Sequence, residues 1–188
     1  YFKRGVMVNH ISELQELLPN FPSDILEQWF LPYVESDGMP WDDHGNPKGR
    51  WNNLLNKKPL SYWQSIGWYQ DTCYIPKDYY SKNVQEALEQ IAAGAVFNEK
   101  NWYTFSINDL KERFDSILKY LEVHKEYPKS PILIYEKFSG FNILDGNHRV
   151  SAYLYSLSQH YMNEKNMKID DLSKFKQKYW IGISKNNI

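Results

Sequence analysis

The sequence predicts an α+β fold, in which a small mixed β-sheet with packed helices follows an aromatic-rich, helical or irregular N-terminal extension. Two patterns carry this prediction. Short apolar runs in the second half are typical of strands, and apolar residues spaced three and four apart beside them indicate helices. The first half instead places prolines and glycines where long elements would otherwise run, which favours short helices and irregular connections.

The extension is expected over residues 7–100, packed on a domain over residues 101–188. Ser12 and Ser23 are good helix caps, so each predicts a short helix after it. Five prolines between residues 31 and 80 then predict an irregular stretch, with short helices near 51–55 and 61–66.

The predicted domain over residues 101–188 has a more regular pattern than the extension. Ser106 is expected to cap an amphipathic helix, because apolar residues recur at helical spacing over the next fifteen positions, at Leu110, Phe114, Ile117, Leu118 and Leu121. The apolar run 131–137 and the segment Phe141–Leu144 predict an antiparallel hairpin, since about five residues connect them and a parallel pair needs a crossover of a dozen or more. A helix should begin within two residues of Asn147, and Tyr179–Ile183 is a last strand.

Aromatic residues are unusually frequent, at 16% of the chain, with 7 Trp, 15 Tyr and 9 Phe. Five tryptophans fall within one stretch of about 40 residues: Trp29, Trp41, Trp51, Trp63 and Trp68. They indicate either a core built from large rings or a surface on which bases stack. We favour the core, because aromatic area is most often buried.

Composition excludes several classes of protein. The formal charge of −1 excludes a global polycation that coats DNA, although it leaves room for a local basic patch. No apolar run reaches the roughly 18 residues of a transmembrane helix, so no membrane partner is expected. Cys73 is the single cysteine, which excludes an internal disulfide, and no secretory pattern opens the chain. A cytoplasmic protein of a bacterium or phage is expected.

The sharpest motif is Asp145-Gly146-Asn147-His148-Arg149, between a predicted strand and a predicted helix. A helix start exposes unpaired N–H groups and partial positive charge. Gly146 lets the backbone turn sharply, and Arg149 and His148 add donors suited to phosphate oxygens. The motif therefore predicts a phosphate cradle formed by Gly146, Asn147, His148 and Arg149. The alternative is a capped helix start whose cations are solvated or pair with acidic neighbours.

From about Ser106 to Ile183, the order of helix, Pro-Ile-Leu-Ile, Phe-Asn-Ile-Leu-Asp-Gly-Asn-His-Arg-Val-Ser-Ala and late strand resembles the ParB/sulfiredoxin superfamily. The resemblance implies a nucleotide whose phosphates are held by the Gly-x-x-Arg turn, here Gly146 to Arg149. Sulfiredoxins carry a cysteine before the His-Arg pair, where this chain has Asn147, so their thiol chemistry is not expected. Partition proteins add a helix-turn-helix domain downstream, so centromere-type DNA reading is not expected either.

Two functions remain open. The first is a nucleotide-dependent enzyme that uses ATP or a related triphosphate, with Mg²⁺ near Asp145, for phosphoryl transfer or for hydrolysis of ATP or a phosphodiester. Asp145 and His148 are its catalytic candidates, and a nucleic acid or a small phosphate acceptor is its second substrate. The second is a plasmid- or phage-type regulatory protein that acts on a partner protein or nucleic acid, with the nucleotide as a switch or lost. The sequence leaves the oligomeric state open.

Two weaker signals complete the candidates. Glu136 ends a predicted strand and could reach the mouth of the cradle, although a solvated hairpin residue is the simpler interpretation. Asp42, Asp43 and His44 could bind a metal, but the Asp, Gly, Asn and Pro content around them favours a turn. No metal site built from protein ligands alone is therefore predicted.

Overall fold

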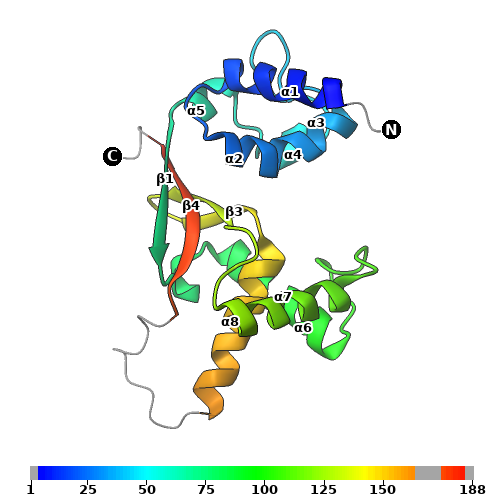
Figure 1. Cartoon of the computed structure of the whole chain (residues 1–188), viewed down its shortest axis with the longest axis vertical. Coiled ribbons are helices and arrows are strands. Elements are labelled where there is room, and N and C mark those ends of the chain that lie inside the picture. Colours follow the sequence, from blue (N-terminus) through cyan, green and yellow to red (C-terminus); the bar gives the residue numbers. More distant parts are fainter. Residues whose placement is uncertain (1–3, 164–174, 185–188) are drawn as a thin grey trace. The chain divides into compact units, whose positions relative to one another are not determined.

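The computed structural model describes residues 4–163 and 175–184 and confirms the α+β class (Figure 1). The helical elements are α1 (Arg4–Leu17), α2 (Ser23–Ile25), the π-helix η1 (Leu26–Phe30), α3 (Leu31–Asp37), α4 (Trp51–Leu54), α5 (Leu60–Gln64), the 3₁₀-helix η2 (Lys77–Tyr79), α6 (Lys82–Phe97), α7 (Leu110–His124) and α8 (Asn147–Asn163). The strands are β1 (Ile66–Cys73), β2 (Ile132–Glu136), β3 (Gly140–Asp145) and β4 (Gln177–Ser184). They form one small mixed sheet in the order β1-β4-β2-β3. Within the described residues, no helix combines the length and the apolar character that crossing a bilayer requires.

The chain divides into two compact units. Of the described residues, 4–69 and 182–184 form one, and 70–163 with 175–181 form the other, so the division falls inside β1 and β4. Helix α6 therefore lies in the second unit, which begins at Gln70. The domain boundary at residue 100 stays a prediction.

The first unit is built around large rings. Trp29, Trp41, Trp51 and Trp63 are at most 6% exposed, which confirms the core interpretation for these four. The rings of Trp29 and Trp63 meet edge to face with centroids 5.3 Å apart, a favoured geometry for aromatic pairs. The fifth tryptophan of the stretch, Trp68, is partly exposed. Burial of these rings is what orders the proline-rich stretch, because each ring removes a large apolar area from water.

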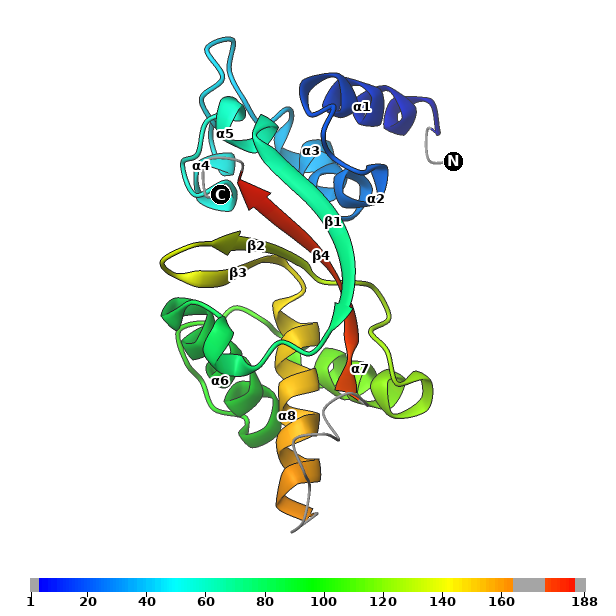
Figure 2. The same ribbon diagram turned by 90° about the vertical axis from the view of Figure 1, so that its left-hand side faces the viewer.

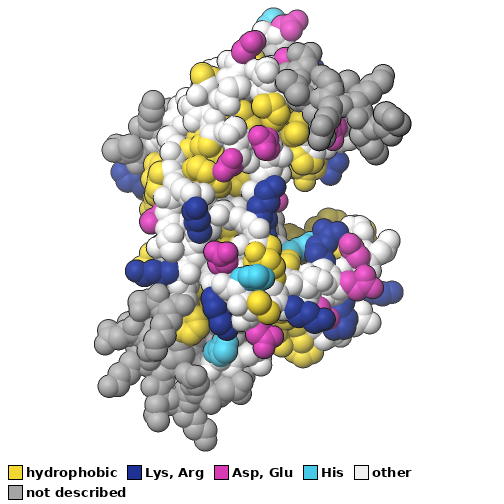
Figure 3. Space-filling view, in the orientation of Figure 1, with side chains coloured by type: hydrophobic (Ala, Val, Ile, Leu, Met, Phe, Trp, Pro, Cys, Tyr) yellow, Lys and Arg dark blue, Asp and Glu magenta, His cyan; other side chains and the backbone are white. Residues whose placement is uncertain are grey.

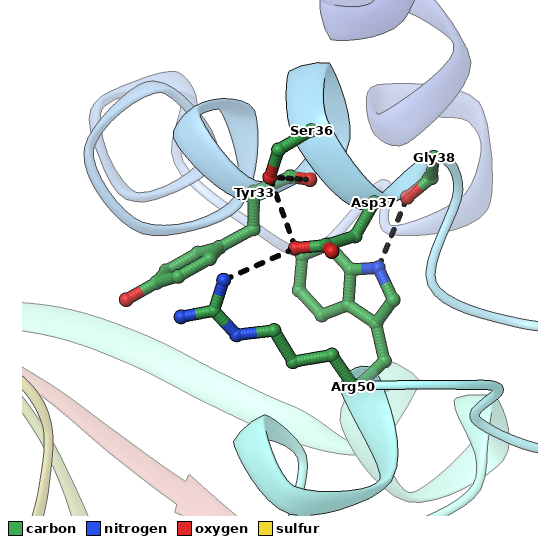
Figure 4. Close-up of polar contacts among 6 residues, drawn as sticks. Tyr33, Ser36, Asp37, Gly38 and Arg50 are labelled. Carbon is green, nitrogen blue, oxygen red and sulfur yellow. Dashed lines mark hydrogen bonds and ion pairs between the residues drawn. The ribbon is translucent and has the colours of Figure 1, made fainter.

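A polar cluster ties the end of α3 to the start of α4 (Figure 4). The Arg50 guanidinium lies 3.4 Å from an Asp37 carboxylate oxygen and 4.9 Å from the centroid of the Tyr33 ring. The indole N–H of Trp51 donates to the carbonyl of Gly38 at 3.0 Å. Trp51 is 1% exposed, and this bond gives its buried indole N–H a hydrogen-bond partner. The cluster therefore allows Trp51 to be buried.

In the second unit, the hairpin and the helix after it are as predicted. β2 and β3 pair antiparallel, with Leu133 opposite Ile143 and Tyr135 opposite Phe141. Helix α8 begins at Asn147, and both α6 and α7 pack against it (Figure 2). These contacts fix the helix that carries the predicted motif.

Several predictions for individual elements are wrong. Helix α1 runs from Arg4 to Leu17, so Ser12 lies inside it and does not cap a helix. Ser23 is the first residue of α2, and Pro22 rather than Ser23 is at its cap position.

Helix α7 begins at Leu110 after Asp109, so Ser106 does not cap it. The residues before it instead form turns in which the N–H of Ile107 donates to the carbonyl of Thr104. Strand β1 runs through a stretch expected to be irregular. Most of its side chains are exposed, so the alternation of apolar and polar residues that predicts a strand is absent.

Candidate functional site

The predicted motif occupies a sharp turn between β3 and α8. Asp145 is the last residue of β3, Gly146 follows with a φ of +105°, and α8 begins at Asn147. A side chain at position 146 would be strained by this φ, and its Cβ would lie 3.0 Å from the Cβ of Pro131. The turn therefore depends on glycine both for its backbone conformation and for its close approach to the chain before β2.

The guanidinium of Arg149 lies over this turn. Its Nη2 donates to a carboxylate oxygen of Asp145 at 2.6 Å, and its side chain is only 13% exposed. A Cβ on Gly146 would lie 3.0 Å from Nη2 and 3.1 Å from Nε of the same residue. The missing side chain of Gly146 thus makes the space in which the guanidinium lies. A first-turn arginine is favoured by an anion or a carboxylate nearby, and Asp145 is that carboxylate in the structure. This pair is what the alternative interpretation, in which the cations pair with acidic neighbours, expects for Arg149.

His148 is partly buried among charges of both signs. Burial lowers the pKa of its imidazole below the ordinary value, and the charge of Arg113 lowers it further. Asp109 raises the pKa, Arg149 lowers it and Asp145 raises it, in decreasing order of effect. With its pKa below the ordinary value of 6.5, the imidazole is predominantly neutral at neutral pH, so it can both accept and donate a proton.

The neighbours of His148 come from the start of α7. Arg113 donates to both carboxylate oxygens of Asp109, at 3.0 and 2.8 Å, and this bond is the largest cause of the lowered pKa of Asp109. The same pair borders an open pocket of about 450 Å³ along α7. Its lining residues are Asp109, Glu112, Arg113, Ser116, Ile117, Tyr120 and Pro128.

A group of buried tyrosines lies in the second unit, and one of them, Tyr127, is within range of the charge of Arg149. The hydroxyls of Tyr127 and Tyr179 are 3.2 Å apart, and the side chains are 7% and 0% exposed. Burial raises the pKa of Tyr127 well above its ordinary value, a shift that the charge of Arg149 partly opposes. Tyr80 is also buried, and burial raises its pKa strongly. These hydroxyls stay neutral at physiological pH.

The structure therefore places Asp145, Gly146, Asn147, His148 and Arg149 in one turn and the first turn of one helix. Each was predicted from the sequence to belong to the same site.

The two weaker candidates are engaged elsewhere. Glu136 accepts hydrogen bonds from Ser139 at 2.9 Å and from Asn142 at 3.1 Å, within the hairpin. Asp42 accepts the backbone N–H groups of His44 and Asn46, at 3.0 and 2.8 Å, which closes a turn. Over residues 4–163 and 175–184, no group of three or more His, Cys, Asp or Glu side chains could hold a metal ion.

Sequence reasoning missed the residues that surround the motif. Asp109 and Arg113 lie about 35 positions before His148, and no spacing rule connects them to it. Pro131 and Tyr179 were assigned only to strands, and Tyr80 and Tyr127 only to an aromatic composition. The single available signal was Arg113 four residues after Asp109, a spacing that indicates an ion pair on a helix but not its position beside His148.

Comparisons with protein-family models, with curated proteins and with solved structures found no significant match.

Proposed function

We propose that the chain binds a nucleoside triphosphate through its phosphates at the Gly146–Arg149 turn and uses it for phosphoryl transfer or for hydrolysis of ATP or a phosphodiester. One observation carries the proposal. A largely buried arginine in the first turn of a 17-residue helix is held by Asp145 across Gly146, where a side chain would fill the space of the guanidinium. The sequence resemblance to the ParB/sulfiredoxin superfamily supports the same assignment.

The arrangement suits a phosphate group for electrostatic reasons. The first N–H groups of a helix have no carbonyl partner within the helix, and the helix dipole adds partial positive charge at that end. Arg149 has five N–H donors, and the bond to Asp145 uses one of them. Phosphate oxygens can therefore accept from the start of α8 and from the guanidinium together.

Asp145 and His148 would then have separate roles. Asp145 orients Arg149, and its carboxylate is the group that would hold Mg²⁺ carried by the nucleotide. Mg²⁺ in such sites takes one or two carboxylates and completes its shell with phosphate oxygens and water, so one carboxylate is sufficient. His148, kept neutral by its surroundings, is the candidate to take a proton from the group that attacks the phosphate.

A small phosphate acceptor is favoured over a nucleic acid as the second substrate. The four most buried tryptophans of the first unit lie in its core, so they do not form the stacking platform that single-stranded nucleic acid would use. Acidic and basic side chains are interspersed on the face that Figure 3 shows, whereas a groove for a phosphate backbone concentrates basic ones. The regulatory alternative instead acts on a partner protein or nucleic acid, with the nucleotide as a switch or lost.

Calorimetric titration tests the proposal. The full chain is titrated with ATP, CTP, GTP and a single-stranded oligonucleotide, each with and without Mg²⁺, and phosphate release is measured in parallel. Arg149→Ala should weaken binding of the preferred nucleotide by about ten- to a hundredfold, the usual effect of losing a charged hydrogen bond. Arg50→Ala removes another arginine that pairs with an aspartate, in the first unit, and should leave binding unchanged.

Unchanged nucleotide affinity in folded Arg149→Ala would overturn the site. Binding that depends on Arg149 but occurs without any turnover would favour the regulatory alternative over the enzyme.

A further inference from the structure

The turn between α6 and α7 is built by specific side-chain hydrogen bonds. Asn101 donates from Nδ2 to the carbonyl of Gln90 at 2.8 Å, and its Oδ1 accepts from the Thr104 hydroxyl at 2.9 Å. The N–H of Tyr103 donates to the same Oδ1 at 3.1 Å. Gly94 on α6 leaves the space that Thr104 fills, since a Cβ there would lie 2.9 Å from its Cγ2. The turn is thus tied to α6 by partly buried polar contacts.

This anchored turn presents large rings to solvent. Phe97, Trp102 and Phe105 are 71%, 80% and 69% exposed, and Tyr103 is 38% exposed. Trp102 and Phe105 contact each other, with ring centroids 5.8 Å apart. We call these four residues the aromatic turn. At 150–250 Å² for a whole ring, they offer on the order of 500 Å² of apolar surface, as much as the largest patch of a typical monomer.

Charges beside the aromatic turn are balanced and adjacent. Glu99 and Lys100 are both exposed, directly before Asn101. A neutral patch has no electrostatic attraction for a polyanion, which disfavours nucleic acid as the partner. Neighbouring opposite charges are instead self-complementary across a two-fold axis, where Glu99 of one copy can face Lys100 of the other in both directions.

We propose that the aromatic turn is a self-association surface whose partner is a second copy of this chain, related by a two-fold axis. The patch supplies more than half of the roughly 800 Å² that each partner buries in a standard interface, and the flanking charges complete its rim. An interface of this size forms a concentration-dependent dimer rather than an obligate one. The inference does not depend on the nucleotide site.

Sedimentation equilibrium of the full chain tests this proposal between about 1 and about 300 μM, the range in which weak specific dimers dissociate. The wild type should shift from monomer to dimer. Trp102→Ser and Phe105→Ser should each raise the dissociation constant at least tenfold. Phe138→Ser is the matched control, because Phe138 is 98% exposed on the β2–β3 hairpin, outside the aromatic turn, and should leave the dimer intact. These rings are exposed, so circular dichroism should show all three variants folded.

Charge reversal distinguishes a second copy from any other partner. Glu99→Lys alone and Lys100→Glu alone place like charges opposite each other and should each weaken self-association. An equimolar mixture of these two variants should recover association, because one copy then carries two positive charges and the other two negative ones.

A wild type that stays monomeric throughout would overturn the proposal. Tryptophan fluorescence that a single-stranded oligonucleotide quenches in the wild type but not in Trp102→Ser would then assign the patch to nucleic acid. A dimer unaffected by Trp102→Ser and Phe105→Ser would overturn it as well.

Discussion

Arg149 Nη2 lies 2.6 Å from Asp145 Oδ2, so the third residue of α8 is bonded back to the last residue of β3 across Gly146. A cation in the first turn of a helix opposes the helix dipole by a few tenths of a kcal/mol. The carboxylate offsets that cost and holds the guanidinium in one orientation before any ligand arrives. A preorganised donor loses less conformational freedom on binding, which favours affinity.

Arg149→Lys tests whether the shape of the guanidinium matters. An ammonium keeps the charge but lacks the planar fork, and its shorter reach changes the bond to Asp145. We expect nucleotide affinity between those of the wild type and Arg149→Ala, with a loss of about three- to tenfold, measured by calorimetry. Full affinity in the lysine variant would show that charge alone binds the phosphate.

Asp145→Asn separates orientation from metal binding. The amide keeps the size of the side chain and an oxygen that can accept from Arg149, but it loses the charge that Mg²⁺ requires. Without Mg²⁺, nucleotide affinity should be equal to or higher than that of the wild type, because a negative charge near the phosphates is gone. With Mg²⁺, the variant should lose the gain in affinity and the turnover that the metal confers on the wild type. Equal Mg²⁺ dependence in both proteins would exclude Asp145 as the metal-holding group.

The motif was predictable because all of its determinants are local. A strand pattern, an Asp-Gly break and a helical pattern place the turn, and the need for glycine follows from the chemistry of sharp turns. The hairpin was equally predictable, because a connection of about five residues permits only antiparallel pairing.

The surroundings of the motif were not predictable because they depend on tertiary packing. The charge of Arg113 acts on His148 because α7 packs on α8. Pro131 lies close to Gly146 because of the register of the hairpin. Strand β1 was missed for a related reason. Its side chains are largely exposed, so pairing with β4 rather than burial of an apolar face makes it a strand.

Nucleotide binding should depend on pH through His148. Its lowered pKa leaves the imidazole neutral in the free protein at neutral pH, and bound phosphate adds negative charge that raises the pKa. Binding then takes up part of a proton, so affinity should rise as the pH falls from about 8 to about 6, across the ordinary histidine pKa. Turnover, which needs the neutral imidazole as a base, should fall over the same range. Calorimetry in buffers of different ionisation enthalpy measures this uptake.

His148→Gln is the control for protonation of the nucleotide itself, whose phosphates titrate in both proteins alike. The variant should show a smaller proton uptake and a flatter pH dependence. In the free protein, Arg113→Gln should raise the pKa of His148, measured by NMR titration, because a nearby positive charge is removed. An unchanged uptake in His148→Gln would place His148 outside the binding site.

Gly146→Ala should damage both the turn and the site. A φ of +105° is rarely adopted by an L-residue and costs on the order of 1–3 kcal/mol of folding stability. The added Cβ would also lie 3.0 Å from both Pro131 and the Arg149 guanidinium, so the arginine must move. We expect a lower melting temperature and a loss of nucleotide affinity comparable to that of Arg149→Ala.

Gly38→Ala separates the effect of backbone strain from the effect of displacing the Arg149 guanidinium. Gly38 also has a positive φ, +74°, but a Cβ there meets no atom within 4 Å. This variant should therefore lose stability through backbone strain and keep full nucleotide affinity, because no side chain of the site is displaced. Normal affinity in folded Gly146→Ala would contradict a phosphate site that depends on the position of Arg149 over the turn, since the added methyl group occupies the space in which the guanidinium lies.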